Sequence, residues 1–512
     1  MRFSLIKASL LSVALSTGAA GAATHQVTVS ADLSQQGPVI NKDIYGQFAE
    51  HLGRGIYEGL WVGPDSSIPN TKGFRNDVIE ALKAMEVPLV RWPGGCFADE
   101  YHWRDGIGPK DERPVKVNTH WGGVEETNAV GTHEFFDLAE LLGAEVYING
   151  NLGSGTVREM AEWMEYMTSD KNSTLANQRR ANGREKPWDI KYFGIGNESW
   201  GCGGHMEPDY YTDLYRQYAT FLKTPPGKKP LLVGSGGHTE DTQWTDVLSK
   251  NIERDMDGIS YHFYTLPNDE WETKGHATKF DEKMWFATLE RTYRMDEYLK
   301  NNIAILDKND PEGELGFYVD EWGTWYDAEE GREPGFLYQQ NTLRDAVVAA
   351  VNLNLFHAYA KRVHMTNIAQ MVNVLQAMIL TDGPEMLKTP TYHIYDMYSV
   401  FQDATSIPLT LEAPDYAMGD KAVPAVTGSL AKGKDGRTYL ALVNLDPNNS
   451  ASIKLDVSGG LDKTLKGEIL TAEKMTAKNT FDDKDAVTPK AFKTTADDFT
   501  LPAKSIVVVA LN

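Results

Sequence analysis

Two glutamates in this sequence each follow an apolar stretch and stand beside a tryptophan. The first is Glu198, in the segment Asp189-Ile-Lys-Tyr-Phe-Gly-Ile-Gly-Asn-Glu-Ser-Trp200. The second is Glu321, in the segment Glu314-Leu-Gly-Phe-Tyr-Val-Asp-Glu-Trp-Gly323. Hydrolysis of a glycosidic bond needs two carboxyl groups, one that donates a proton and one that attacks carbon. The pair therefore indicates a glycosidase, whereas either glutamate alone would equally suit a solvated strand end.

Other polar residues also follow predicted strands. They are Glu50, Arg91, Asn197, His262, Tyr264 and Gln370. At the carboxyl ends of a barrel's strands, such side chains meet at one mouth even when they are far apart in the chain. Together with Trp103 and Trp121 on nearby loops, they suit a sugar, which offers hydroxyl groups and an apolar ring face. We therefore predict one sugar-binding site at the mouth of a barrel.

A repeating order of strand and helix runs through residues 41–403 and predicts a (β/α)8 TIM barrel, a fold of the α/β class. The predicted strands are 44–48, 87–90, 145–148, 190–195, 230–233, 256–261, 315–319 and 363–368. The predicted helices are 74–85, 134–142, 157–167, 210–222, 244–248, 284–305, 341–360 and 392–401. This order puts Glu198 at the end of the fourth strand and Glu321 at the end of the seventh.

From about residue 404 the pattern changes to short strands separated by turns rich in Asn, Gly, Asp and Lys. Because no helical period appears there, we predict a C-terminal all-β sandwich, jelly-roll-like, over residues 404–512. Residues 24–40 alternate loosely between apolar and polar types, and we expect N-terminal strands from this stretch to join the same sandwich.

Residues 1–22 are predicted to be a signal peptide outside the fold. Arg2 and Lys7 give a positive start, residues 8–15 are apolar, and Ala20-Gly-Ala22 matches a cleavage site. No later stretch is apolar for long enough to span a membrane. The sequence therefore predicts an exported enzyme, either periplasmic or extracellular.

Composition and charge limit the partners. The 512 residues carry a formal net charge of −22, so no basic face is expected for nucleic acid. No spacing of Cys and His resembles a metal-ligand set. Since two carboxyl groups can hydrolyse a glycoside unaided, we predict no metal and no cofactor. The two cysteines, Cys96 and Cys202, suit either a disulfide or two inert thiols, and both alternatives stay open.

Several long motifs resemble those of the α-L-arabinofuranosidases of glycoside hydrolase family 51. They are Phe48-Ala-Glu-His51, Arg91-Trp-Pro-Gly-Gly-Cys-Phe-Ala-Asp99, Gly196-Asn-Glu-Ser-Trp-Gly-Cys-Gly-Gly204, Val319-Asp-Glu-Trp-Gly323 and Ile368-Ala-Gln-Met-Val-Asn-Val374. The resemblance covers essentially everything after the predicted signal peptide. It implies that Glu198 is the acid/base and Glu321 the nucleophile.

The same resemblance implies the substrate-binding residues. They are Glu50, Arg91, Cys96, Trp121, Asn197, His262, Tyr264 and Gln370. Some members of the family carry Asn, which contacts the sugar, where this chain has Cys96. Many members are intracellular hexamers, so a homo-oligomer is a further possibility.

The predicted activity is that of an exo-acting, retaining enzyme that releases terminal α-L-arabinofuranosyl residues from arabinan, arabinoxylan and arabino-oligosaccharides. A carboxyl separation of about 5 to 5.5 Å would accompany retention, and about 6.5 to 9.5 Å would accompany inversion. One alternative is another retaining barrel glycosidase, acting on β-xylosides or β-glucans. A second alternative, from a different class, is a non-catalytic sugar-binding protein.

Overall fold

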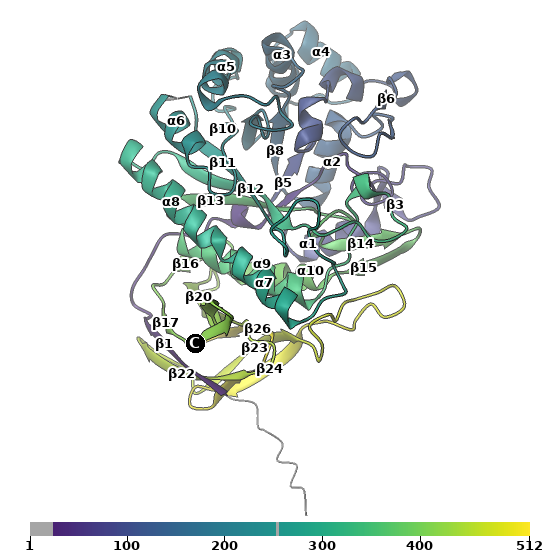
Figure 1. Cartoon of the computed structure of the whole chain (residues 1–512). Helices are drawn as coiled ribbons and strands as arrows, with labels where there is room; N and C mark the ends of the chain where they lie inside the picture. The colour runs from purple at the N-terminus through teal and green to yellow at the C-terminus, as the bar shows by residue number, and fades with distance from the viewer. Residues whose placement is uncertain (1–23, 252–254) are drawn as a thin grey trace, which may run out of the picture.

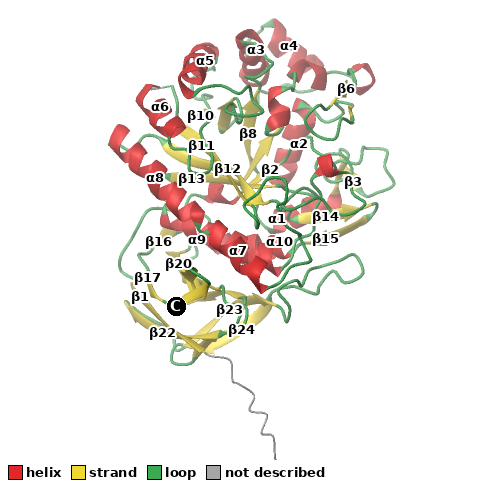
Figure 2. Ribbon diagram, viewed as in Figure 1, coloured by secondary structure: helices red, strands yellow, loops and turns green. Residues whose placement is uncertain are grey.

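The computed structural model describes residues 24–251 and 255–512. Within these residues, eight parallel strands close into a barrel with helices around it (Figures 1 and 2). The barrel strands are β2 (Gly46–Phe48), β5 (Leu89–Trp92), β8 (Glu145–Gly150), β9 (Tyr192–Ile195), β10 (Leu231–Gly234), β11 (Gly258–Thr265), β12 (Gly316–Thr324) and β13 (Val363–Ala369). The predicted barrel is confirmed.

Each of these strands is followed by one or two helices, which cover the outside of the barrel (Figure 2). They are α1 (Asn76–Ala84), α2 (Thr132–Leu142), α3 (Val157–Thr168), α4 (Thr174–Ala181), α5 (Pro208–Phe221), α6 (Gln243–Asn251), α7 (Glu282–Thr292), α8 (Arg294–Asn309), α9 (Leu343–Ala358) and α10 (Pro390–Tyr398). Helix α4 was not predicted, because it buries only Ala176 and Arg179 and so has no apolar period.

The single helix predicted over residues 284–305 is wrong, because α7 ends and α8 begins on either side of Tyr293. The hydroxyl groups of Thr288 and Thr292 donate to the carbonyl oxygens of Met284 and Thr288, one helical turn earlier. Such bonds from threonine to the preceding turn bend a helix. The apolar period continues across the bend, so it could not reveal the break.

The C-terminal region consists mainly of two sheets that pack on each other, which confirms the predicted β-sandwich. One sheet has the order β16 (Thr405–Ser406), β20 (Val426–Lys432), β21 (Thr438–Asn444), β26 (Ser505–Ala510), β23 (Thr464–Thr471) and β24 (Lys490–Thr495). The other has the order β17 (Thr410–Glu412), β1 (Thr24–Asp32), β22 (Ser450–Ser458) and β25 (Phe499–Leu501). We keep the division of the chain into residues 24–40, 41–403 and 404–512 as a proposal.

Helix α9 lies between the barrel and the sandwich (Figure 1). Every residue from Leu343 to His357 is buried, because the helix packs on β12 on one side and on β20 on the other. A helix that is apolar on nearly all sides is expected in such a position. Within residues 24–251 and 255–512, no helix combines the length and apolar character needed to cross a membrane.

Candidate active site

An apolar layer fills the barrel interior before the polar residues begin. It consists of Leu89, Tyr147, Tyr192, Val233, Tyr318 and Met365. Side chains two residues apart in a strand share a face. Arg91, two residues after Leu89, and Asp320, two residues after Tyr318, therefore lie inside the barrel toward the carboxyl ends of the strands.

Arg91 connects three of the strands at this level. Its Nη1 donates to Oε2 of Glu321 at 2.9 Å, and its Nη2 donates to Oδ1 of Asn197 at 2.5 Å. Its Nε lies 3.7 Å from Oδ2 of Asp320. Burial would lower the pKa of Arg91, but the negative charges of Asp320 and Glu321 raise it, so the guanidinium remains charged.

Both Asp320 and Glu321 point into the barrel although they are neighbours in β12. Asp320 accepts hydrogen bonds from Ser260 Oγ at 2.5 Å and Tyr147 OH at 2.7 Å, and Glu321 accepts one from Tyr264 OH at 2.8 Å. Neighbours in a regular strand would face opposite ways. Register shifts on both sides of β12 interrupt the ladder here. Such irregularities re-aim side chains beside active sites.

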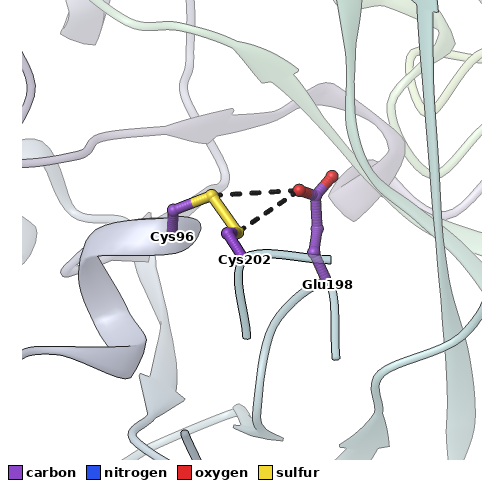
Figure 3. Close-up of side chains that lie close together, drawn as sticks. All are labelled: Cys96, Glu198 and Cys202. Carbon is purple, nitrogen blue, oxygen red and sulfur yellow. Dashed lines mark hydrogen bonds between the residues drawn. A yellow bond between two sulfur atoms is a disulfide. The ribbon is translucent and has the colours of Figure 1, made fainter. Parts of the chain in front are cut away.

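Glu198 lies beyond the end of β9, in a tight turn, with φ of +42°. This left-handed conformation is costly for a residue with a side chain and is common at functional sites. Oε1 of Glu198 lies 2.8 Å from Nδ1 of His262. Oε2 lies 3.5 Å from Sγ of Cys202 and 3.9 Å from Sγ of Cys96, and the two sulfurs form a disulfide (Figure 3). Of the two alternatives for the cysteines, the structure contains the disulfide.

His262 links the two glutamates. One carboxylate oxygen from each glutamate and a ring nitrogen of His262 all lie within 4.8 Å of one another. Burial alone would lower the pKa of His262, but the charge of Glu321 and hydrogen bonds to Asp320 and Glu198 raise it to about 10. The ring is therefore an imidazolium at neutral pH, which donates to Glu198 from Nδ1.

Glu50 is a third carboxyl group beside the pair. Its Oε1 accepts from the backbone N–H of Gly95 and Phe97 and from Nε1 of Trp121, at 3.0, 3.1 and 2.9 Å. Its Oε2 accepts from Nε2 of Gln370 at 3.1 Å. Burial, followed by the negative charge of Glu321, raises the pKa of Glu50 to about 7.

The glycines of the Arg91–Asp99 motif allow this close packing. A Cβ atom on Gly94 would lie 2.6 Å from Cγ of Glu50, and one on Gly95 would lie 2.9 Å from Oε2 of Glu321. Both distances are shorter than packed atoms tolerate, so these positions require glycine for close approach.

Asp99 holds the surrounding loops together, a role that the sequence did not reveal. Its carboxylate accepts from the backbone N–H of Leu152 and Gly153, both at 2.8 Å, and of Asn197 at 3.0 Å. Burial raises the pKa of Asp99 to about 7. Its position in the same motif as Arg91 was the available signal.

The structure brings together ten residues predicted for the site. They are Glu50, Arg91, Cys96, Trp121, Asn197, Glu198, His262, Tyr264, Glu321 and Gln370. Trp103 is an exception, because it is 1% exposed and stacks on Trp163 in the hydrophobic core. The expectation that Trp103 meets the sugar is therefore wrong.

Comparison with known proteins identifies the family. The model of the Alpha-L-arabinofuranosidase 1 domain matches residues 81–285, and that of the Alpha-L-arabinofuranosidase C-terminal domain matches residues 320–505. The crystal structure of the GH51 arabinofuranosidase from Xanthomonas axonopodis pv. citri has 52% sequence identity and a TM-score of 0.94, covering 95% of this chain and 100% of that one. The chain belongs to the GH51 α-L-arabinofuranosidases.

Two further relatives agree with this assignment. An intracellular exo-alpha-L-arabinofuranosidase of Bacteroides ovatus is 49% identical over 515 residues, which cover 99% of both chains. The alpha-L-arabinofuranosidase from Thermotoga maritima, solved as an arabinose complex, is 30% identical with a TM-score of 0.84, covering 95% of this chain and 100% of that one. GH51 is a retaining family of glycoside hydrolases, so the predicted enzyme class is confirmed.

The prediction of an exported GH51 enzyme is wrong, because the Bacteroides ovatus relative is named intracellular. That alignment leaves only about 1% of this chain unmatched, so it reaches into residues 1–22, where the signal peptide was predicted. A basic, then apolar, then small-residue order over such a short stretch is therefore a weak signal for export. Residues 1–22 lie outside the described part of the chain.

Proposed function

We propose that this GH51 enzyme is an exo-acting α-L-arabinofuranosidase that cleaves terminal non-reducing arabinofuranosyl residues by double displacement, with Glu321 as nucleophile and Glu198 as acid/base. The substrates are arabinan, arabinoxylan and arabino-oligosaccharides. The observation that carries the proposal is the approach of the two carboxylates, whose nearest oxygens lie within 4.8 Å. This limit lies below the roughly 6.5 to 9.5 Å that inversion needs for its water, and it therefore supports retention, for which the carboxyl groups are roughly 5 to 5.5 Å apart.

In the first step, a carboxylate oxygen of Glu321 attacks the anomeric carbon of the sugar. The hydrogen bonds from Arg91 Nη1 and Tyr264 OH, at 2.9 and 2.8 Å, fix the orientation of this carboxylate. At the same time, Glu198 gives its proton to the oxygen of the leaving group. The bond to the aglycone breaks, and the sugar becomes an ester of Glu321.

In the second step, Glu198 takes a proton from a water molecule that attacks the same carbon. The ester bond to Glu321 breaks, and arabinose leaves with its anomeric configuration retained. His262 donates to Oε1 of Glu198 at 2.8 Å and supports the negative charge that Glu198 carries between the steps. The side chains of Glu198 and Glu321 are 17% and 10% exposed, so a substrate can reach both.

The remaining polar groups bind the arabinofuranosyl ring. Within the described residues, Oε1 of Gln370 is buried without a hydrogen-bond partner, and a sugar hydroxyl would satisfy it. Glu50, Trp121 and Asn197 are the other residues that we expect to contact the sugar here. The arabinose complex of the Thermotoga maritima relative supports the same sugar here.

The relative named intracellular and exo-acting supports an intracellular, exo-acting enzyme here as well. An intracellular enzyme would meet arabinan and arabinoxylan as the arabino-oligosaccharides released from them. Assembly into a homo-oligomer stays a proposal.

The test is the anomer released first from a branched arabino-oligosaccharide, followed by proton NMR before mutarotation. We expect α-L-arabinofuranose first, and nitrophenyl α-L-arabinofuranoside cleaved faster than the β-xyloside and the β-glucoside. Release of the β-anomer first would contradict double displacement. Faster cleavage of the β-xyloside would contradict the proposed substrate.

A further inference from the structure

The Cys96–Cys202 pair lies directly against the acid/base glutamate. Cys96 is in the turn Cys96–Asp99 that follows β5, and Cys202 is in the glycine-rich turn that follows β9. Their sulfurs lie 3.9 and 3.5 Å from Oε2 of Glu198, and both cysteines are partly exposed (Figure 3). A disulfide sulfur carries no hydrogen, so these contacts do not satisfy an ionised Glu198. The proposed mechanism gives the pair no role.

We propose that this pair, once reduced, forms with Glu198 a binding site for a thiophilic divalent cation such as Zn²⁺, and that the bound cation stops hydrolysis. Thiolates and a carboxylate are ordinary zinc ligands, and a water molecule would complete a tetrahedron. An oxygen of Glu198 held by a cation cannot deliver a proton to the leaving group. The inhibitory consequence rests on the role proposed for Glu198, but cation binding itself does not.

The present geometry is close to that of a zinc site. With Zn–S bonds of about 2.3 Å and a Zn–O bond of about 2.0 Å, a tetrahedral ion separates a sulfur and an oxygen ligand by about 3.5 Å. The observed separations from Glu198 Oε2 are 3.5 and 3.9 Å. The two sulfurs would have to move apart to about 3.8 Å. With the two Cα atoms 5.6 Å apart, rotation of the cysteine side chains can supply that separation.

The two turns stay together without the disulfide. The carboxylate of Asp99, at the end of the first turn, accepts from the backbone N–H of Asn197, at the start of the second, at 3.0 Å. A Cβ atom on Gly203 would lie 1.9 Å from the carbonyl oxygen of Asn197, so the second turn folds tightly on itself. Reduction therefore leaves two thiols beside Glu198 rather than two separated loops.

The charge around the pair favours a cation. Four carboxyl groups gather here, from Glu50, Glu198, Asp320 and Glu321. Two cationic side chains, Arg91 and His262, oppose them. Even with Glu50 protonated, the three remaining carboxylates outnumber the two cations, so a cation at the sulfurs would reduce an uncompensated negative charge.

Reduction by an external dithiol balances as thiol–disulfide exchange. A thiolate of the dithiol attacks one sulfur, the mixed disulfide is attacked by the second thiol, and the dithiol leaves as a cyclic disulfide. The two thiol protons of the dithiol pass to Cys96 and Cys202, and cation binding later releases these protons to solvent. In the intracellular compartment proposed above, thiols are kept reduced, so the enzyme would stand there as an active dithiol that is inhibited only when it binds a cation.

The test is a titration of the full-length enzyme with Co²⁺, followed by displacement with Zn²⁺. The oxidised protein and the protein reduced with dithiothreitol, then desalted without oxygen, are compared. We expect the reduced protein to bind one Co²⁺ per chain with a thiolate charge-transfer band in the near ultraviolet, and the oxidised protein to show no such band. Zn²⁺ should abolish the band and inhibit only the reduced enzyme, and EDTA should restore activity.

Variants assign the ligands. Cys202→Ser should bind Co²⁺ at least about tenfold more weakly in the reduced state, and Glu198→Gln should keep the band but bind at least about tenfold more weakly. If Cys202→Ser does not fold, reduced wild type alkylated at both thiols replaces it. The proposal is overturned if the reduced protein takes up no Co²⁺, or if alkylation leaves the binding unchanged. Because Co²⁺ binding is read without substrate, this outcome is distinct from a failure of the proposed hydrolytic mechanism.

Discussion

The two glutamates are held in contrasting ways. Glu321 lies within β12, is buried and accepts hydrogen bonds from Arg91 and Tyr264 on its two oxygens. Glu198 lies in a turn beyond β9 with a left-handed backbone, and its Oε2 faces the Cys96–Cys202 disulfide instead of a nitrogen donor. One carboxylate is fixed by donors on both oxygens, and the other keeps one oxygen next to sulfur.

This difference matches the different demands of the two proposed roles. A nucleophile acts as a carboxylate in one orientation, and donors on both oxygens fix that orientation. An acid/base gains and loses a proton in each cycle, so an oxygen without a fixed N–H donor is free to carry the proton. If the roles were exchanged, Arg91 and Tyr264 would leave neither oxygen of the acid free to carry the proton, whereas His262 engages only Oε1 of Glu198.

Removal of the Glu321 carboxylate should have the largest effect. We expect Glu321→Gly to lower kcat for all arabinofuranosides by about 10⁴-fold or more, because no attacking group remains. Azide, entering the space left by the side chain, should restore turnover of an activated aryl arabinofuranoside and give an arabinosyl azide of inverted configuration. NMR of the product measures this outcome. Glu80→Gln, exposed on α1, is the control for expression and folding.

Removal of the Glu198 carboxylate should discriminate between substrates. We expect Glu198→Ala to lower kcat/KM by about 10²- to 10⁴-fold for natural linkages, because their leaving groups need a proton. Aryl arabinofuranosides with good leaving groups should keep most of their kcat/KM. Azide should now intercept the sugar ester of Glu321 and give a product of retained configuration. Equal losses for activated and natural substrates would contradict the distinction between the two glutamates.

Glu50 tests the ionised state of Glu321 in this comparison, because burial and then the negative charge of Glu321 raise the pKa of Glu50. Its pKa is about 7 in the folded protein, against an ordinary 4.5. The folded state therefore binds more protons than the unfolded state between these values, and this group lowers the free energy of unfolding as the pH rises from about 4.5 to about 7. Over this range the free energy of unfolding falls by about 3 kcal/mol through this group.

Glu50→Gln should remove that dependence. We expect the difference in free energy of unfolding between wild type and Glu50→Gln to shift in favour of the variant between pH 5 and pH 8. Other titrating groups cancel in this difference because both proteins share them. Urea unfolding at the two pH values measures it, and a difference that does not change with pH would show that Glu50 is ionised throughout.

Much of this site could be predicted from the sequence because a barrel turns strand order into position. Apolar runs predicted the positions of the strands, and most of the polar residues that follow these strands lie together at the mouth of the barrel. The short-range details were not predictable. The register shifts that turn both Asp320 and Glu321 inward depend on neighbouring strands, and the fate of the cysteines depends on two loops that are far apart in the sequence.

Trp103 shows where the same reasoning fails. A tryptophan in a loop after a strand was expected at the mouth, yet Trp103 donates to the carbonyl oxygen of Glu159 and stacks on Trp163 in the core. Trp121, in the same long connection, does reach Glu50. The sequence contains no signal that separates the two, because loop tryptophans serve both purposes and only the tertiary path decides.

The smallest effect should come from Tyr264→Phe, which removes one hydrogen bond from Glu321 and leaves Arg91 in place. A hydrogen bond to a charged group contributes about 1.5 to 3 kcal/mol, so kcat/KM should fall by about 10- to 150-fold. The ring still packs on Trp325, and stability should change by about 1 kcal/mol or less. Because Tyr264 acts through the nucleophile, the loss should be similar for activated and natural arabinofuranosides. A loss confined to poor leaving groups would instead assign Tyr264 to proton transfer, and the separation between a fixed nucleophile and a freer acid/base would no longer hold.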